Sequence, residues 1–382
     1  MKNDRTAETP GFGSDLLTKR QDALGLPSAQ VATLQEKLLT WYEACRRDLP
    51  WRRTRDPYAI WVSEIMLQQT RVETVIPYYE RFLTRFPTAL ALAEAPPDEV
   101  LAQWSGLGYY RRARLLLEGA RVVAGRGGVV PSDREGLLEV PGIGRYTAGA
   151  IASIAFGEPV GLVDGNVARV LARVFGIDED MRKRGMRTAE LVADAIVAKR
   201  DPGAWNQALM ELGATVCTPR SPSCERCPIA NSCRALRENR VAQLPVLSEK
   251  KAPVARRVQA VVAIRGAGPA KSGAVLLARR RPELLFGGLW EPPSIEGSAK
   301  MRRTLTAWLP VGKLVRAGAV EHVLSHRKLT IDVLRAPLTG ELDVNDVPEA
   351  AGYDAVRVLP LSEIGDLGIS TLTRKILGVA GC

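Results

Sequence analysis

The chain has 382 residues, of which 46% are hydrophobic and 25% charged, with a formal net charge of +11 and an isoelectric point near 9.5. This composition is that of an ordinary soluble protein with room for two domains. No apolar run is long enough to span a bilayer, and the N-terminus has no apolar secretory core. The positive charge suits a polyanionic partner such as nucleic acid, although a basic chain without that partner would look the same.

The residue pattern changes along the chain. A polar N-terminal stretch is expected to be a disordered tail, and after it apolar residues recur at helical spacing between short Gly and Pro turns. A charged, Pro-containing stretch then indicates a linker, and beyond it β-branched residues alternate as in strands. We predict a tail at 1–28, an all-α domain at 29–233, a linker at 234–256, and an α+β domain at 257–382 with helices near 300–309 and 370–379.

A glutamate lies among apolar residues in the predicted helix DPYAIWVSEIMLQQT. Glu64 has apolar neighbours on nearly every side, which counts against a solvated position on a polar helix face. Partial burial raises the pKa of a carboxyl group and keeps a proton on it near neutral pH. Glu64 is therefore a candidate proton donor.

Two helical patterns meet in EVPGIGRYTAGAI, residues 139–151. Gly142 and Gly144 permit a tight turn and expose backbone N–H groups at a helix N-terminus, an arrangement that suits a phosphate. Many helix–helix turns share this pattern, so alone it is a weak signal. Further on, Asp164 in GLVDGNVARV precedes another predicted helix, where an aspartate is a good N-cap. A capping carboxylate stays ionised, so Asp164 could also stabilise a cationic sugar.

Four cysteines follow the helical region at the spacing C-x6-C-x2-C-x5-C. A reducing compartment disfavours disulfides, and four thiolates in one short loop can hold an iron–sulfur cluster or a zinc ion. The spacing alone does not separate these two possibilities, and a structural role is sufficient to explain either. The candidate ligands are Cys217, Cys224, Cys227 and Cys233.

Together, these motifs resemble the endonuclease III superfamily of helix-hairpin-helix DNA glycosylases. Within it, WVSEIMLQQTRVETVIPYY, GLGYYRRARLL and NQALMELGA resemble the adenine DNA glycosylase (MutY) family. The resemblance is dense over residues 49–233 and weaker beyond. It implies helical modules that grip DNA, a [4Fe–4S] cluster in the cysteine loop, and a C-terminal α+β domain similar to the Nudix (MutT-like) fold.

The resemblance also implies roles for residues. Glu64 would protonate the leaving adenine, and Asp164 would stabilise an oxocarbenium-like sugar, with Tyr146 and Asn166 as supporting polar groups. The target base must leave the stack, so other side chains should fill the gap and hold the base. By resemblance these are Gln69 and Tyr109 as wedges with Leu107 nearby, Thr70 near the opposite base, and Arg52 and Gln207 in the adenine pocket.

Tyr146 bears on the reaction type. In the bifunctional relatives that nick the strand, a lysine at this place after the hairpin forms a Schiff base. The run here is Gly144-Arg145-Tyr146, so we predict a monofunctional enzyme that leaves an abasic site. The alternative is an endonuclease III-like glycosylase and lyase for oxidised pyrimidines, which Tyr146 and the C-terminal domain count against.

The two histidines of the chain, His322 and His326, lie in EHVLSHRKL. An H-x3-H pair on a helix would suggest a metal site, but the flanking patterns predict strand, loop and strand. In the family, a Phe-Ser-His loop at this place reads 8-oxoguanine. This chain has Leu324-Ser325-His326, so we assign reading of that base to Ser325 and His326 and expect stacking to be lost at Leu324. No Nudix catalytic box is present, so no nucleotide pyrophosphatase activity is expected.

These observations predict an adenine DNA glycosylase of base excision repair. Its substrate would be duplex DNA with adenine opposite 8-oxoguanine or guanine. We expect a monomer without a membrane partner, located in the cytoplasm and on the nucleoid if the source is bacterial. A non-catalytic DNA-binding protein with an iron–sulfur redox sensor is the second alternative, and the pairing of Glu64 with Asp164 counts against it.

Overall fold

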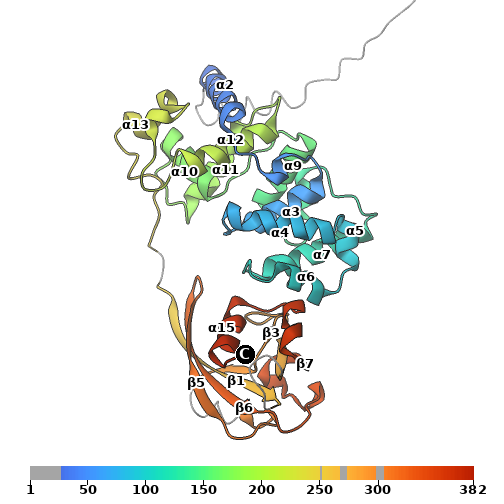
Figure 1. The fold of residues 1–382 in the computed structure, drawn as a ribbon. Helices are drawn as coiled ribbons and strands as arrows, with labels where there is room; N and C mark the ends of the chain where they lie inside the picture. The colour runs from blue at the N-terminus through green and yellow to red at the C-terminus, as the bar shows by residue number, and fades with distance from the viewer. Residues whose placement is uncertain (1–26, 250–251, 267–272, 298–304) are drawn as a thin grey trace, which may run out of the picture. The chain divides into compact units, whose positions relative to one another are not determined.

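The computed structural model describes residues 27–249, 252–266, 273–297 and 305–382 (Figure 1). Contacts group the chain into two compact units: unit 1 combines residues 1–64 with 129–249, and unit 2 combines 65–128 with 250–382. This grouping cuts across the predicted all-α domain. The predicted tail and the first half of the helix expected near 300–309 lie outside the described residues.

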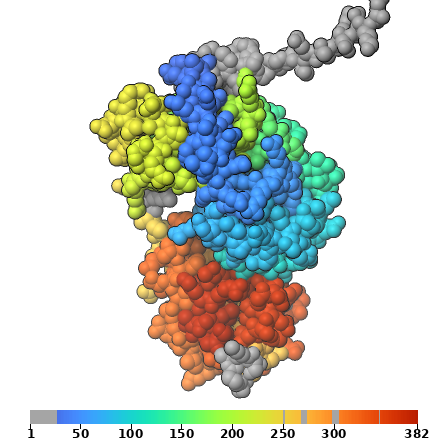
Figure 2. All heavy atoms as spheres, turned by 45° about the horizontal axis from the view of Figure 1, so that its top comes forward, coloured from blue at the N-terminus to red at the C-terminus, as the bar shows by residue number. Residues whose placement is uncertain are grey.

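Unit 1 is built of helices around one apolar core. Its helices are α2 (Ser28–Cys45), η1 (Pro50–Arg52), most of α3 (Pro57–Leu67), α8 (Arg134–Leu138), α9 (Arg145–Phe156), α10 (Gly165–Phe175), α11 (Arg184–Ala195), α12 (Pro202–Thr215), η2 (Cys224–Arg226), η3 (Ala230–Ser232) and α13 (Arg234–Arg237). In this core, Leu38 and Tyr42 of α2 pack with Trp205 and Leu209 of α12 and with Val170 of α10. Figure 2 shows α2 running along the surface beside the segment that contains the cysteines.

The approach of α12 to α10 depends on a glycine. A Cβ atom at Gly213 would lie 2.7 Å from Cβ of Asn166, which is closer than real contacts allow. Without that atom, the start of α10 lies directly against α12. This packing fixes the place of Asp164 and Asn166, which begin α10.

Residues 234–249 were predicted as part of a linker, but they pack on unit 1. Leu244 is buried, and the Met181 backbone N–H donates to the Val246 carbonyl at 2.9 Å. The buried guanidinium of Arg173 donates to the Val241 and Leu244 carbonyls at 3.2 and 2.9 Å. The linker was predicted from the charge and proline content of this segment. That composition reflects the side chains that face solvent and gives no sign of these backbone contacts.

Unit 2 combines helices from residues 65–128 with a mixed sheet and further helices from its C-terminal part. After the end of α3, its first part contains α4 (Val72–Arg85), α5 (Ala89–Glu94), α6 (Pro97–Trp104) and α7 (Arg111–Gly125), and its C-terminal part includes the short helices η4 (Val344–Asp346), η5 (Glu349–Ala351) and η6 (Leu361–Asp366). Phe82 of α4 makes edge-to-face contacts with Phe86 and with Trp104 of α6, at 4.9 and 5.8 Å between ring centroids. These aromatic contacts hold α4 and α6 together.

The sheet belongs to the predicted α+β class. Its strands are β1 (Val254–Arg265), β2 (Ala274–Arg280), β3 (Trp290–Glu291), β4 (Ser294–Glu296), β5 (Val315–Val323), β6 (Arg327–Pro337) and β7 (Tyr353–Pro360). The main order is β3-β2-β1-β6-β5, with β4 beside β1 and β7 beside β2. Strands β1 and β6 are parallel, and the other pairs are antiparallel. Helix α15 (Thr371–Val379), predicted near 370–379, covers one face (Figure 1).

The two histidines lie in a strand–loop–strand, as predicted. His322 belongs to β5 opposite Leu329 of β6, and residues 324–326 form the loop between these strands. No group of three or more His, Cys, Asp or Glu side chains that could hold a metal ion occurs in the described ranges. In the same ranges, no helix combines the length and apolarity needed to cross a membrane.

Candidate active site

Glu64 lies on α3 in the interior of unit 1 and is only 4% exposed, which confirms its predicted burial. The phenol of Tyr146, from the first turn of α9, donates a hydrogen bond to Oε2 of Glu64 at 2.5 Å. The Tyr146 oxygen also lies 3.3 Å from the Met210 sulfur. Three helices, α3, α9 and α12, therefore meet at one carboxyl group.

Burial raises the pKa of Glu64 to about 7. The hydrogen bond from Tyr146 and the charge of Arg52 lower this pKa, and the charge of Asp164 raises it further. A carboxyl with a pKa near 7 holds a proton on about half of the molecules at neutral pH, which is the condition for an efficient general acid.

Asp164 is the N-cap of α10, as predicted. Its Oδ1 accepts from the Val167 backbone N–H at 2.7 Å, and its Oδ2 accepts from Asn166 Nδ2 at 3.1 Å. Burial raises the pKa of Asp164, and these hydrogen bonds oppose the rise because they stabilise the ionised form. The donors make Asp164 suited to remain a carboxylate while Glu64 holds a proton.

Arg169 links this carboxylate to the cysteine loop and was not singled out by the sequence analysis. Its Nη2 donates to Asn166 Oδ1 at 2.9 Å and to the Gly213 carbonyl at 2.8 Å. Its Nε donates to the Cys217 carbonyl at 2.8 Å. The bond to Oδ1 leaves the Asn166 amide nitrogen to face Asp164. The sequence could have indicated the contact between these two residues, because Arg169 follows Asn166 by about one helical turn and therefore lies on the same side of the helix.

Arg52 approaches the site from η1, with its charge already paired. Its Nη2 donates to Glu211 Oε2 at 2.8 Å, and Arg47 binds the same carboxylate through Nε and Nη2 at 2.7 and 2.9 Å. Burial alone would raise the pKa of Glu211, but the hydrogen bonds from the two arginines outweigh it, and the pKa lies below its usual value. Gln207 is half-buried on α12, where its amide bonds to the Gly203 carbonyl at 3.3 Å.

The glycine hairpin has the predicted form of a turn between α8 and α9. Gly142 has φ +82°, in the left-handed region that glycine adopts without strain. Gly144 is the N-cap of α9, and no described side chain caps this helix. Glycine at this position brings no side chain over the start of α9, and the backbone N–H groups of such a helix start can bind a phosphate.

All four cysteines of the loop are free thiols that line one small, mostly apolar pocket. Arg173, 2% exposed, donates from Nη1 to the Cys217 sulfur at 3.3 Å and to the Thr218 carbonyl at 2.8 Å. A buried cation beside the sulfurs suits an anionic thiolate cluster. Four thiols around one small pocket suit a metal centre, either an iron–sulfur cluster or a zinc ion.

In unit 2, the two predicted wedge residues have unusual backbones. Gln69 has φ +58° and Tyr109 has φ +49°, both in the left-handed region that non-glycine residues rarely adopt. Gln69 is exposed, and Tyr109 is 49% exposed although it is a large aromatic residue. Leu107 is only 6% exposed and packs in the interior, whereas Thr70 is half-buried next to Gln69. Of these four residues, Gln69 and Tyr109 are the exposed ones.

Tyr109 also contacts the loop expected to read 8-oxoguanine. Its phenol oxygen lies 3.0 Å from Ser325 Oγ, and both Ser325 and His326 are exposed. Leu324 is partly buried against the core of the sheet, and the ring of His322 lies 6.3 Å from that of Phe286. The structure brings Tyr109 and Ser325 together and turns Leu324 inward.

Comparison with protein families agrees with this arrangement. Residues 62–194 match the HhH-GPD superfamily of base excision DNA repair proteins, and residues 217–233 match the iron–sulfur binding domain of endonuclease III. Residues 266–378 match the NUDIX domain. The helical hairpin fold, the iron–sulfur cluster and the Nudix-like fold are thereby confirmed.

Curated relatives decide the family. The adenine DNA glycosylase of Homo sapiens is 39% identical over 92% of this chain and 74% of its own length. That of Rattus norvegicus is 39% identical over 92% of this chain and 78% of its own length. The chain belongs to the adenine DNA glycosylase family. A solved structure titled as a thermostable thymine-DNA glycosylase is 32% identical, covers 55% of this chain and 98% of its own, and superimposes with a TM-score of 0.51.

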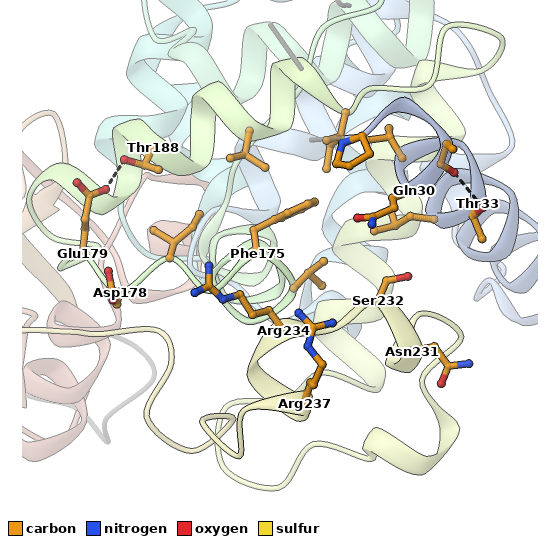
Figure 3. A pocket seen from close by; sticks show the side chains of 18 residues that line it. Gln30, Thr33, Phe175, Asp178, Glu179, Thr188, Asn231, Ser232, Arg234 and Arg237 are labelled. Atoms are coloured by element: carbon orange, nitrogen blue, oxygen red, sulfur yellow. Dashed lines mark hydrogen bonds between the residues drawn. The ribbon is translucent and has the colours of Figure 1, made fainter. Parts of the chain in front are cut away.

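One groove in the described part of unit 1 of this family member lies away from Glu64 and Asp164. It has a volume of about 930 Å³ and runs between α2, the end of α10 and the cysteine loop (Figure 3). Arg234 and Arg237 lie on one side of it, and Glu179, which accepts a hydrogen bond from Thr188, lies on another. None of the predicted site residues lines this groove.

Proposed function

We propose that this enzyme excises adenine from duplex DNA, with adenine opposite 8-oxoguanine or guanine as its substrate. The observation that carries the proposal is the buried pair of Glu64 and Tyr146. Burial raises the pKa of Glu64 to about 7, and Asp164 contributes to that rise across the same site. Glu64 with Tyr146 offers one available proton and Asp164 offers one carboxylate, which together are what cleavage of an N-glycosidic bond requires.

The chemistry proceeds in two steps. Glu64 gives its proton to a ring nitrogen of adenine, and the bond between C1′ and the base breaks with its electron pair leaving on the base. The sugar then has oxocarbenium character, and the Asp164 carboxylate stabilises that positive charge. Water adds to C1′, and the Glu64 carboxylate takes the proton that the water loses. Asn166 holds Asp164 through the hydrogen bond at 3.1 Å.

The proposed enzyme is monofunctional because no amine occupies the place from which a Schiff base would form. Tyr146 stands there, and its hydroxyl is already bonded to Glu64. A phenol buried beside two carboxylates has a pKa well above 10 and stays neutral. It can orient Glu64 but supplies no amine for a Schiff base.

Other side chains have proposed roles in binding. Gln69 and Tyr109 enter the duplex where the adenine leaves, and Thr70 lies near the opposite base. The contact of Tyr109 with Ser325 at 3.0 Å supports placing the wedge and the reader of 8-oxoguanine at one point on the DNA. The remaining assignments are Arg52 and Gln207 to the adenine pocket, His326 to 8-oxoguanine, and the backbone at Gly142 and Gly144 to a phosphate.

The test uses a duplex that contains one adenine opposite 8-oxoguanine, labelled on the adenine strand. We expect strand breaks only after alkali, since the enzyme leaves an abasic site. Breaks without alkali would show a lyase and contradict the role given to Tyr146. The absence of breaks under both conditions, with binding retained, would refute adenine excision. A duplex with adenine opposite thymine is the matched control and should remain intact.

A further inference from the structure

Arg112 lies near the start of α7 and is 9% exposed. Its guanidinium lies between two segments of unit 2: residues 65–70, which are the end of α3 with the turn after it and are here called the Gln69 loop, and residues 106–109, the Tyr109 loop. The group donates to both loops. The bonds from Nη1 go to the carbonyls of Ile65, Met66 and Gln68 at 2.8, 2.9 and 2.6 Å, and those from Nη2 to Thr70 Oγ1, the Gly108 carbonyl and the Leu107 carbonyl at 3.1, 3.1 and 3.5 Å.

No carboxylate within the described ranges forms an ion pair with Arg112. The cation is instead held by loop oxygens and by two aromatic rings. Its Cζ lies 5.5 Å from the centre of the Trp104 ring and 5.6 Å from that of Tyr109. Burial lowers the pKa of Arg112 to about 10, which leaves it charged at neutral pH. Its hydrogen bonds therefore serve the loops and not an ion pair.

Both loops need such support. Gln69 and Tyr109 have positive φ values, and a non-glycine residue keeps this conformation only where its surroundings impose it. The Arg112 bonds end on residues next to each of them: on Gln68 and Thr70 beside Gln69, and on Gly108 beside Tyr109. One planar group thus fixes two strained turns relative to each other.

We propose that Arg112 is a positioning residue that holds the Gln69 and Tyr109 loops at a fixed spacing before DNA binds. The inference rests on the wedge roles in the proposed function. Loops that are already ordered lose little entropy on binding, and two wedges at fixed spacing enter the duplex together. Lysine cannot replace Arg112, because one ammonium group cannot reach acceptors on both loops in the geometry of a planar fork.

The test compares Arg112→Lys with Arg121→Lys in the full chain. Arg121 is a matched control, since it lies on the same helix and donates to the Ala93 and Ala95 carbonyls at the end of α5, where no predicted site residue lies. The duplex carries 2-aminopurine in place of the target adenine opposite 8-oxoguanine, and both variants are made in a Glu64→Gln background to prevent cleavage. Fluorescence reports unstacking of the base.

We expect R112K to reduce the fluorescence rise at least threefold and, with Glu64 intact, to slow single-turnover excision at least tenfold. R121K should change both less than threefold. Hydrogen exchange should quicken in residues 65–70 and 106–109 of R112K but not in α4 or β6, where a general loss of structure would show. Equal behaviour of the two variants, or faster exchange throughout unit 2, would overturn the inference. If the wild-type chain excises no adenine, the proposed function fails instead.

A second comparison applies if R112K folds poorly. Glycine accepts a positive φ without strain, so Gln69→Gly removes part of the backbone strain that the hydrogen bonds of Arg112 have to offset. The drop in thermal midpoint caused by R112K should then be smaller in the Q69G background by about 2 °C or more. Equal drops in both backgrounds would show that Arg112 does not support the left-handed turn at Gln69, and would refute the inference.

Discussion

Substitution of Glu64 by glutamine should remove activity and also stabilise the fold. Loss of a general acid slows a reaction by roughly 10²–10⁴-fold. The effect on stability follows from burial, which raises the pKa of Glu64 from 4.5 to about 7. Folded and unfolded chains therefore bind different numbers of protons between these two pH values, and stability must depend on pH there.

The sign is fixed by the direction of the shift. Between pH 4.5 and about 7 the folded chain keeps the proton on Glu64 and the unfolded chain has lost it, so stability falls as the pH rises. One pKa unit corresponds to about 1.4 kcal/mol, so the total penalty above pH 7 is about 3 kcal/mol. Glutamine is neutral at every pH, and its side-chain oxygen can keep the bond from Tyr146. The variant should thus gain up to about 3 kcal/mol at pH 8 and nothing below pH 4.5.

The assay is urea unfolding followed by circular dichroism at pH 4.5, 6 and 8, with single-turnover excision measured on the same preparations. An exposed glutamate, Glu43 on α2, provides the control, and E43Q should show no pH-dependent gain. If E64Q and the wild type differ in stability by the same amount at all three pH values, the pKa of Glu64 is not raised. If E64Q keeps full activity, Glu64 is not the acid.

Three further variants test the neighbours of Glu64 and the cluster. Tyr146→Phe removes a hydrogen bond that lowers the pKa of Glu64, so the alkaline fall in the excision rate should move up by about one pH unit; an unmoved profile would contradict the bond's role. Glu211→Gln leaves the mostly buried Arg52 and the partly exposed Arg47 without their anion and should cost about 3 kcal/mol in urea unfolding, so a loss below 1 kcal/mol would argue against the pairing. Cys227→Ser should lose iron and visible absorbance, whereas serine at the exposed Cys45 should keep both; iron content equal to that of the wild type in C227S would refute its ligand role.

The parts of the site that sequence could predict are those encoded locally. The cysteine spacing lies within residues 217–233, the hairpin within residues 139–151, and Asp164 caps the helix that it precedes. The burial of Glu64 could be inferred from its own neighbours on α3. Each of these inferences needs only one segment of chain. The structure confirms the hairpin turn, the cap and the burial of Glu64, and it places the four cysteines around one pocket.

Contacts between distant segments could not be predicted in this way. In the sequence, Glu211 is a single charged residue within a predicted helix. No residue close to it in the sequence indicates that Arg47, 164 residues away, binds it. Arg112 reads as one of several surface cations in YYRRARLL, yet it is buried between two loops. The left-handed turn at Gln69 has no sequence signal either, because glutamine does not favour that conformation and only its surroundings impose it.

The distant contact of Glu211 with Arg52 also explains how Glu64 can keep a raised pKa beside a cation. Arg52 lowers the pKa of Glu64, and a free guanidinium close to a buried carboxyl would form an ion pair with it and ionise it at neutral pH. Glu211 engages Arg52 at 2.8 Å and provides the opposite charge elsewhere. Arg52 can then take its proposed place in the adenine pocket while Glu64 retains its proton. If Glu64 is the acid, as we propose, this ion pair supports acid catalysis, and E211Q should lower the pH at which excision falls as well as the stability.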